Sequence, residues 1–165
     1  MKRRTLHESR IRQAMQLWGQ ATPEAPTMPS AADRIRRVRL IFEEAFEFAE
    51  AAAVEVAYCN PGLGPGRGDV PLQFHTLSFK LADSGDADPD MVLMVDALAD
   101  CSVVVTGGFI DCGVCSEPIL ESVDSNNLDK AGRGHLDPMT GKFIKPEDHQ
   151  PPPIPALLRL QGWGC

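Results

Sequence analysis

At 165 residues the chain has the length of one domain with room for a hydrophobic core. Its formal charge of −7 and isoelectric point near 5.0 argue against a general binder of nucleic-acid phosphates. No uninterrupted apolar run reaches membrane-spanning length, and no apolar signal segment follows the basic start Met1–Arg4. We therefore expect a single domain over 1–165 that stays cytoplasmic, with reduced cysteines and with neither a nucleic acid nor a membrane as partner.

The first half of the chain predicts two helices. Leu6–Trp18 has the apolar spacing of a helix and is ended by Gly19, after which a proline-rich connector covers 21–32. Ser30 is a suitable N-cap for a second helix that begins near Ala31. This helix is predicted to run to about Tyr58, because Asn-Pro-Gly follows at 60–62.

The segment 60–90 is predicted to be an irregular insertion. It starts as a glycine–proline loop and ends, over 84–90, as an acidic loop. Between them, 71–81 fits either a short strand or a helical turn.

The second half predicts two more helices and a tail. Residues 89–112 form the most apolar helix, and 117–131 form the next. Cys112 and Cys115 have no second cysteine pair or nearby histidine, so they are interpreted as small core residues and not as a zinc site. An extended, proline-containing tail is predicted over 132–165, and it includes a small hairpin with its tip at 137–141.

Acidic residues on the second helix suggest a cation site. Glu43, Glu47 and Glu50 fall within one narrow stripe, and Glu44 stands about 100° away. The arginines of this helix all precede the acids, so no Glu–Lys or Glu–Arg pairing offsets the repulsion. Unless the stripe faces open water, a cation should lie against it.

The third helix carries the matching acids. Asp96 and Asp100 lie one turn apart in a helix that is otherwise apolar around nearly its whole circumference, and buried carboxylates need a partner. Because no histidine stands on either helix, the ligands would all be oxygens, which favours Mg²⁺, with Mn²⁺ as substitute, over zinc or iron. Magnesium held by carboxylates commonly completes its shell with phosphate, and Lys130, Lys142 and Lys145 are available to neutralise that phosphate.

These motifs resemble a known family. The runs R-L-I-F-E-E-A-F-E-F-A-E-A, V-D-A-L-A-D-C-S-V-V-V-T-G-G, S-V-D-S-N-N-L-D-K-A-G-R-G and G-K-F-I-K-P are similar to the all-α nucleoside triphosphate pyrophosphohydrolases, which include MazG, the dimeric dUTPases and phosphoribosyl-ATP pyrophosphohydrolase. The resemblance covers most of the chain outside 60–90. It implies Mg²⁺-dependent cleavage between the α- and β-phosphates of a nucleotide.

The resemblance also implies roles for individual residues. The family's first acidic motif falls on Glu43, Glu44 and Glu47, and the second on Asp100. Ala97 stands where the second motif usually has glutamate, and Asp96 is the nearest replacement. The resemblance implies five metal ligands: Glu43, Glu44, Glu47, Asp96 and Asp100. It also implies that Glu43 or Glu44 acts as the general base and that Lys130 is a catalytic cation. The implied contacts with the nucleotide are Trp18, Gln20, Asn126, Asn127, Lys130, Lys142 and Lys145.

The resulting expectation is an all-α bundle of four to five helices that assembles as a homodimer or homotetramer, because a partner would cover the apolar third helix. Its expected activity is hydrolysis of a nucleoside triphosphate to monophosphate and pyrophosphate. The departure at Ala97 keeps open an inactive nucleotide- or protein-binding module. A plain structural bundle with solvated acids is the third alternative and leaves Asp96 and Asp100 unexplained.

Overall fold

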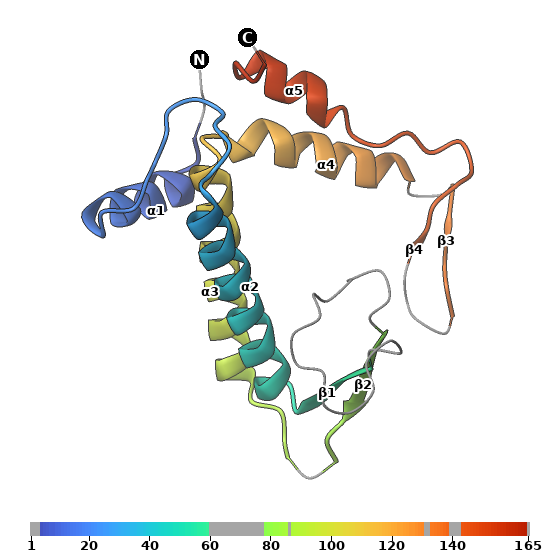
Figure 1. The fold of residues 1–165 in the computed structure, drawn as a ribbon. Coiled ribbons are helices and arrows are strands. Elements are labelled where there is room, and N and C mark those ends of the chain that lie inside the picture. Colours follow the sequence, from blue (N-terminus) through green and yellow to red (C-terminus); the bar gives the residue numbers. More distant parts are fainter. Residues whose placement is uncertain (1–3, 60–77, 86, 131–132, 139–142, 165) are drawn as a thin grey trace. The chain divides into compact units, whose positions relative to one another are not determined.

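The computed structural model describes residues 4–59, 78–85, 87–130, 133–138 and 143–164, and helices predominate within them (Figure 1). The predicted all-α class is confirmed. The helices are α1 (Leu6–Leu17), α2 (Ala31–Ala51), α3 (Met91–Asp111), α4 (Ser116–Lys130) and α5 (Ile154–Leu160). Two antiparallel hairpins join β1 (Val54–Cys59) to β2 (Ser78–Asp83) and β3 (His135–Leu136) to β4 (Phe143–Ile144).

Helix α2 begins as predicted and ends earlier. Ser30 caps it, since its Oγ accepts from Asp33 N at 3.1 Å and donates to the Asp33 carboxylate at 2.6 Å. The prediction that the helix continues to Tyr58 is wrong. Ala53 takes a left-handed conformation with φ of 55°, which stops the helix, and the alternating sequence from Val54 onward pairs as strand β1.

Two further expectations are corrected. Within the predicted insertion, the strand alternative holds for 78–83, whereas 71–77 and the glycine–proline loop lie outside the described residues. The predicted small hairpin is present as β3–β4, but the tail is not extended throughout, because it also contains helix α5. Residues 139–141 of the predicted hairpin tip also lie outside the described residues.

The chain divides into two compact units: unit 1 comprises 1–37 and 105–165, and unit 2 comprises 38–104. In unit 1 the core contains Met15 of α1, Ile110 of α3 and Ile119 of α4. The buried Glu8 carboxylate accepts from Ser116 N at 3.2 Å and Ser116 Oγ at 2.6 Å. Helix α1 therefore supplies the cap for the first turn of α4.

A buried ion pair joins the start of α2 to the end of α3, again within unit 1. Arg37 Nε donates to Asp111 Oδ2 at 2.8 Å, and the Asp111 side chain is 4% exposed. Gly107 makes room for this contact, because a Cβ there would lie against the Arg37 guanidinium, 2.7 Å from its central carbon. The absence of a side chain at Gly107 therefore lets the Arg37 side chain of α2 lie close to α3.

Helix α3 is apolar and, over much of its length, exposed. In its most apolar stretch of 18 residues, mean hydropathy is 1.7 and 22% of the residues are buried. By length and composition alone it is long and apolar enough to cross a membrane, although the sequence analysis found no such run. Core helices of soluble proteins meet the same two criteria, so this finding alone does not make α3 a membrane span.

Candidate functional site

The acids of α2 lie in unit 2, over two consecutive helical turns. Glu43 and Glu47 are exposed and four residues apart, which places them on one face. Glu44, one residue further round the helix, is half-buried. The helical period therefore gathers three carboxylates within a short length of α2.

The acids of α3 also lie in unit 2, and they are more exposed than expected. Asp96 and Asp100 are both exposed, whereas Ala97 between them is 5% exposed and belongs to the core. The inference that these carboxylates are buried inside an apolar helix is wrong. Ala97, the departure from the family pattern, faces the protein interior.

Four of the predicted acids lie close enough to Glu44 to influence its pKa. Burial raises the pKa of Glu44 above its ordinary value, and the negative charges of neighbouring carboxylates raise it further. The neighbours that contribute are Glu47, Asp100, Glu43 and Asp96, in decreasing order. The structure thus brings the predicted acids of α2 and α3 together into one acid cluster.

The thiol of Cys101 also lies near these carboxylates. Burial raises its pKa, and Glu44, Asp100 and Glu47 raise it further. The sequence analysis did not connect it with the acids, although its position directly after Asp100 was the available signal.

The donors of the acid cluster suit a hard divalent cation, because all five offer carboxylate oxygens. Within the part of the chain that the structure describes, no three His, Cys, Asp or Glu side chains converge closely enough to hold a metal ion. The acids are therefore electrostatic neighbours whose oxygens do not meet at one point. Their role as ligands remains a prediction.

The predicted nucleotide-binding residues that the structure describes belong to unit 1. The indole of Trp18 is 66% exposed at the end of α1, and Gln20 N donates to Met15 O at 2.9 Å. Lys130 Nζ donates to Asn127 Oδ1 at 2.6 Å. Asn126 Nδ2 donates to the Gln150 carbonyl at 2.7 Å, so this side chain holds the tail. Lys142 lies outside the described residues.

Two basic residues that the sequence analysis missed accompany these lysines. The pKa of His149 is lowered by desolvation and then by the positive charges of Lys130, Lys145 and Arg133. Arg133 and His149 thus lie near two of the predicted phosphate-binding lysines. For Arg133, the available signal in the sequence was its position directly after α4.

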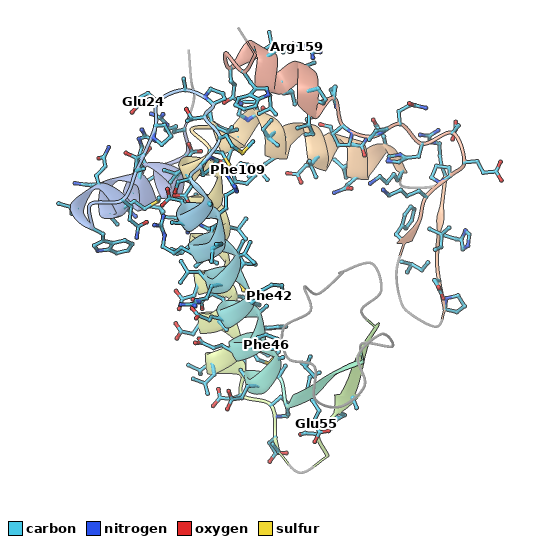
Figure 2. The ribbon with its side chains drawn as sticks, in the orientation of Figure 1. Glu24, Phe42, Phe46, Glu55, Phe109 and Arg159 are labelled. Carbon is cyan, nitrogen blue, oxygen red and sulfur yellow. The ribbon has the colours of Figure 1, made fainter. Side chains whose placement is uncertain are left out.

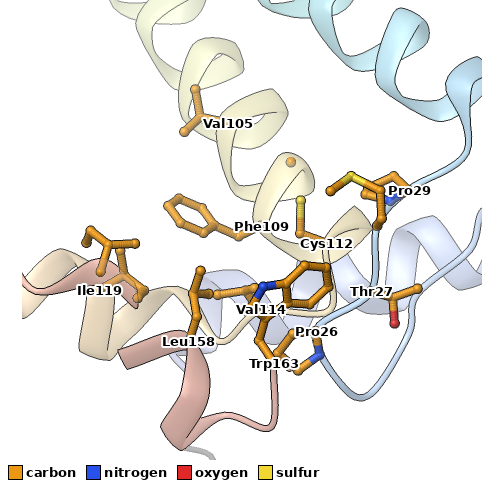
Figure 3. Close-up of a pocket in the computed structure, with 13 residues that line it drawn as sticks. Pro26, Thr27, Pro29, Val105, Phe109, Cys112, Val114, Ile119, Leu158 and Trp163 are labelled. Carbon is orange, nitrogen blue, oxygen red and sulfur yellow. The ribbon is translucent and has the colours of Figure 1, made fainter. Parts of the chain in front are cut away.

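Unit 1 also contains an apolar pocket of about 380 Å³ (Figure 3). Phe109 and Cys112 of α3, Ile119 of α4, and Leu158 and Trp163 near the C-terminus are among its lining residues. Among the described residues, no charged side chain lines this pocket, and none of the five clustered acids does. The pocket suits an apolar group, because its lining is almost entirely apolar.

These observations define a class: an all-α protein with a cluster of carboxylates on two of its helices. The profile of the phosphoribosyl-ATP pyrophosphohydrolase family matches residues 9–127, and the chain belongs to this family, within the MazG-like superfamily of nucleotide pyrophosphohydrolases. The match includes the whole acid cluster and ends before Lys130. It confirms the resemblance seen in the sequence. Comparison with curated proteins gave no match.

Proposed function

We propose that the protein hydrolyses a nucleoside triphosphate between its α- and β-phosphates, with Mg²⁺, to a nucleoside monophosphate and pyrophosphate. The observation that carries this proposal is the acid cluster, in which four other carboxylates raise the pKa of Glu44. Carboxylates grouped in this way repel one another when no cation is bound. A divalent cation bound among them would remove this repulsion and stabilise the site. Family membership supplies the reaction class, a pyrophosphohydrolysis.

The chain's own residues divide the chemistry between them. Glu43, Glu44, Glu47, Asp96 and Asp100 would hold the ion, which supplies positive charge to the phosphate oxygens and acidity to water. Glu43 or Glu44 takes a proton from the attacking water as its oxygen bonds to the α-phosphorus. The bond from that phosphorus to the bridging oxygen breaks, and its electron pair leaves on pyrophosphate. Lys130 and the lysines of the tail stabilise this charge.

The test is pyrophosphate release from a panel of ribo- and deoxyribonucleoside triphosphates together with phosphoribosyl-ATP, the substrate in the family's name. We expect turnover with Mg²⁺ or Mn²⁺, little with Zn²⁺, and none in excess chelator. Glu47→Gln and Asp100→Asn should abolish turnover while the fold stays intact. Glu121→Gln, which changes an exposed acid of α4 outside the cluster, is the matched control and should retain turnover.

The alternative is a nucleotide-binding module without turnover, which the alanine at position 97 favours. A folded protein that binds a nucleotide with Mg²⁺ and releases no pyrophosphate from any member of the panel would establish this alternative. Full activity in excess chelator would contradict the metal-dependent mechanism.

A further inference from the structure

Three segments of unit 1 enclose the apolar pocket (Figure 3). The last turns of α3 and the first turn of α4 form one side, the connector before α2 forms the second, and α5 with the turn after it forms the third. Among the lining residues, Val114 and Ile119 are buried, whereas Met28, Val105 and Trp163 are exposed. The pocket therefore has a buried floor and an open rim, which a flat apolar face lacks.

Hydrogen bonds hold the second and third sides against the first. Thr27 N donates to the Cys112 carbonyl at 2.8 Å, which joins the connector to the residue after α3. Gln161 Oε1 accepts from Cys115 N at 2.7 Å, and Gln161 Nε2 donates to the Cys115 carbonyl at 3.1 Å. One side chain thus pairs with both backbone groups of Cys115 and fixes the C-terminal turn beside α4. Because the protein's own contacts fix the walls, binding there would cost little conformational entropy.

The lining and the size of the pocket decide what kind of molecule fits. Among the described residues no charged side chain lines it, so a charged group inside would lose its hydration without gaining a partner. Phe109 and Trp163 offer aromatic rings for contact with another ring. An apolar cavity of about 150 Å³ holds one benzene molecule, and this pocket has about 380 Å³. The match is an uncharged molecule of two or three rings, or a branched hydrocarbon of that size.

We propose that this pocket is a binding site for a small, uncharged, apolar molecule. The site shares no described residue with the acid cluster or with the predicted nucleotide contacts. The inference therefore goes beyond the proposed function and does not depend on it. A ligand in the pocket replaces water against the apolar walls, and it stabilises the folded protein because the unfolded chain has no such site.

The first test compares two fluorescent probes that share one ring system. N-phenyl-1-naphthylamine is uncharged, whereas 1-anilinonaphthalene-8-sulfonate carries a sulfonate. Titration of the full chain, in chelator and without nucleotide, should show that the uncharged probe binds roughly tenfold more tightly, because the lining offers the sulfonate no partner. The uncharged probe should also raise the melting temperature. An equal or higher affinity for the sulfonate would overturn the proposal.

Two matched variants then locate the bound probe. Val105 on α3 and Leu120 on α4 are 46% and 45% exposed, and of these two only Val105 lines the pocket. Val105→Glu should weaken binding of the uncharged probe several-fold, because it adds a carboxylate at the rim. Leu120→Glu makes the same kind of change outside the pocket and should leave the affinity unchanged. Equal affinities in the two folded variants, as checked by thermal melting, would overturn the proposal.

The thiol of Cys112 gives a direct readout that needs no substitution. Cys112 lines the pocket, and Cys101, on the same helix, does not; both are half-buried free thiols. Labelling with N-ethylmaleimide, followed by mass spectrometry of the peptides, measures each site separately. Saturation with the uncharged probe should slow labelling of Cys112 several-fold and leave that of Cys101 unchanged. Equal slowing at both cysteines, or at neither, would contradict binding in this pocket.

The same experiments distinguish a small ligand from a second copy of the chain. If another copy covered the pocket, the apparent affinity for the uncharged probe would fall as the protein concentration rises. Val105→Glu would then also lower the mass measured by light scattering, and Leu120→Glu would not. We expect an affinity that is independent of protein concentration and a mass that Val105→Glu leaves unchanged. The opposite result in both measurements would assign the pocket to an interface and overturn the proposal.

Discussion

Within the acid cluster, Glu44 is the residue whose pKa is raised by the neighbouring negative charges. It is half-buried on α2, and both its burial and four neighbouring carboxylates favour its protonated form. The folded protein therefore binds this proton more readily than the unfolded chain does. The sign of the consequence follows from proton linkage: the free energy of unfolding falls as pH rises from the ordinary glutamate value of 4.5 through the raised pKa of Glu44.

The first stability prediction concerns this proton. In chelator, the melting temperature should fall as pH is raised through that window, and Glu44→Gln should remove this contribution to the slope. Adding Mg²⁺ should raise the melting temperature at neutral pH in the wild type, and less in Glu47→Gln. Glu121→Gln, outside the cluster, should keep the wild-type slope. A slope that is identical in Glu44→Gln and wild type would show that Glu44 is not coupled to stability.

Residues differ in how far the sequence could predict their surroundings. The grouping of Glu43, Glu44 and Glu47 follows from the helical period, which spacing alone reveals. The exposure of Asp96 and Asp100 does not follow from spacing. Helix α3 is apolar around nearly its whole circumference, so spacing does not indicate which of its faces the rest of the protein covers. Arg133 and His149 come together through the return of a hairpin, and local sequence patterns do not specify such tertiary contacts.

Among the elements, α4 depends on α1 for its first turn. The Glu8 carboxylate binds both Ser116 N and Ser116 Oγ, and Arg4 Nε lies 3.4 Å from Glu8 Oε1. Helix N-termini carry unpaired amide groups and partial positive charge, which a carboxylate satisfies. Here the carboxylate comes from a residue 108 positions earlier in the chain.

The prediction at this scale is that Glu8→Ala destabilises the protein by about 2–4 kcal/mol, because it leaves buried donors of Ser116 without an acceptor and opens a cavity. Glu8→Gln keeps one oxygen acceptor and should cost less. Denaturant unfolding measures both, and Glu121→Ala on the exposed surface of α4 serves as control. If Glu8→Ala and Glu121→Ala unfolded at the same denaturant concentration, the contact would not anchor α4.

Element boundaries show where sequence patterns fail. The starts and ends of α1, α3 and α4 follow apolar spacing and lie within two residues of the prediction. The end of α2 was missed because alanine has high helix propensity and Ala51–Ala53 reads as helix. The left-handed turn at Ala53 instead reflects the pairing of β1 with β2, and Ser84 N donates to the Ala53 carbonyl at 2.9 Å.

At the scale of the whole molecule, unit 2 leaves much apolar surface uncovered. On α2, Phe42 and Phe46 are 40% and 54% exposed, with ring centroids 6.4 Å apart (Figure 2). On α3, Met91 and Val92 are 70% and 77% exposed. Soluble proteins rarely leave extended apolar patches in water, and those that exist commonly form interfaces. The proposed occupant of this surface is a second copy of the chain.

The last prediction is therefore a homo-oligomer. Light scattering at micromolar concentration should give at least twice the 17.9-kDa mass of one chain. Phe46→Glu should shift the protein toward the monomer, because a charge in an apolar interface loses its hydration without gaining a partner. Leu17→Glu makes the same kind of change at an 80% exposed residue of α1 and should leave the mass unchanged. A folded wild-type protein with the mass of one chain would contradict the prediction. If both variants dissociated equally, the interface would not be confined to the exposed face of unit 2.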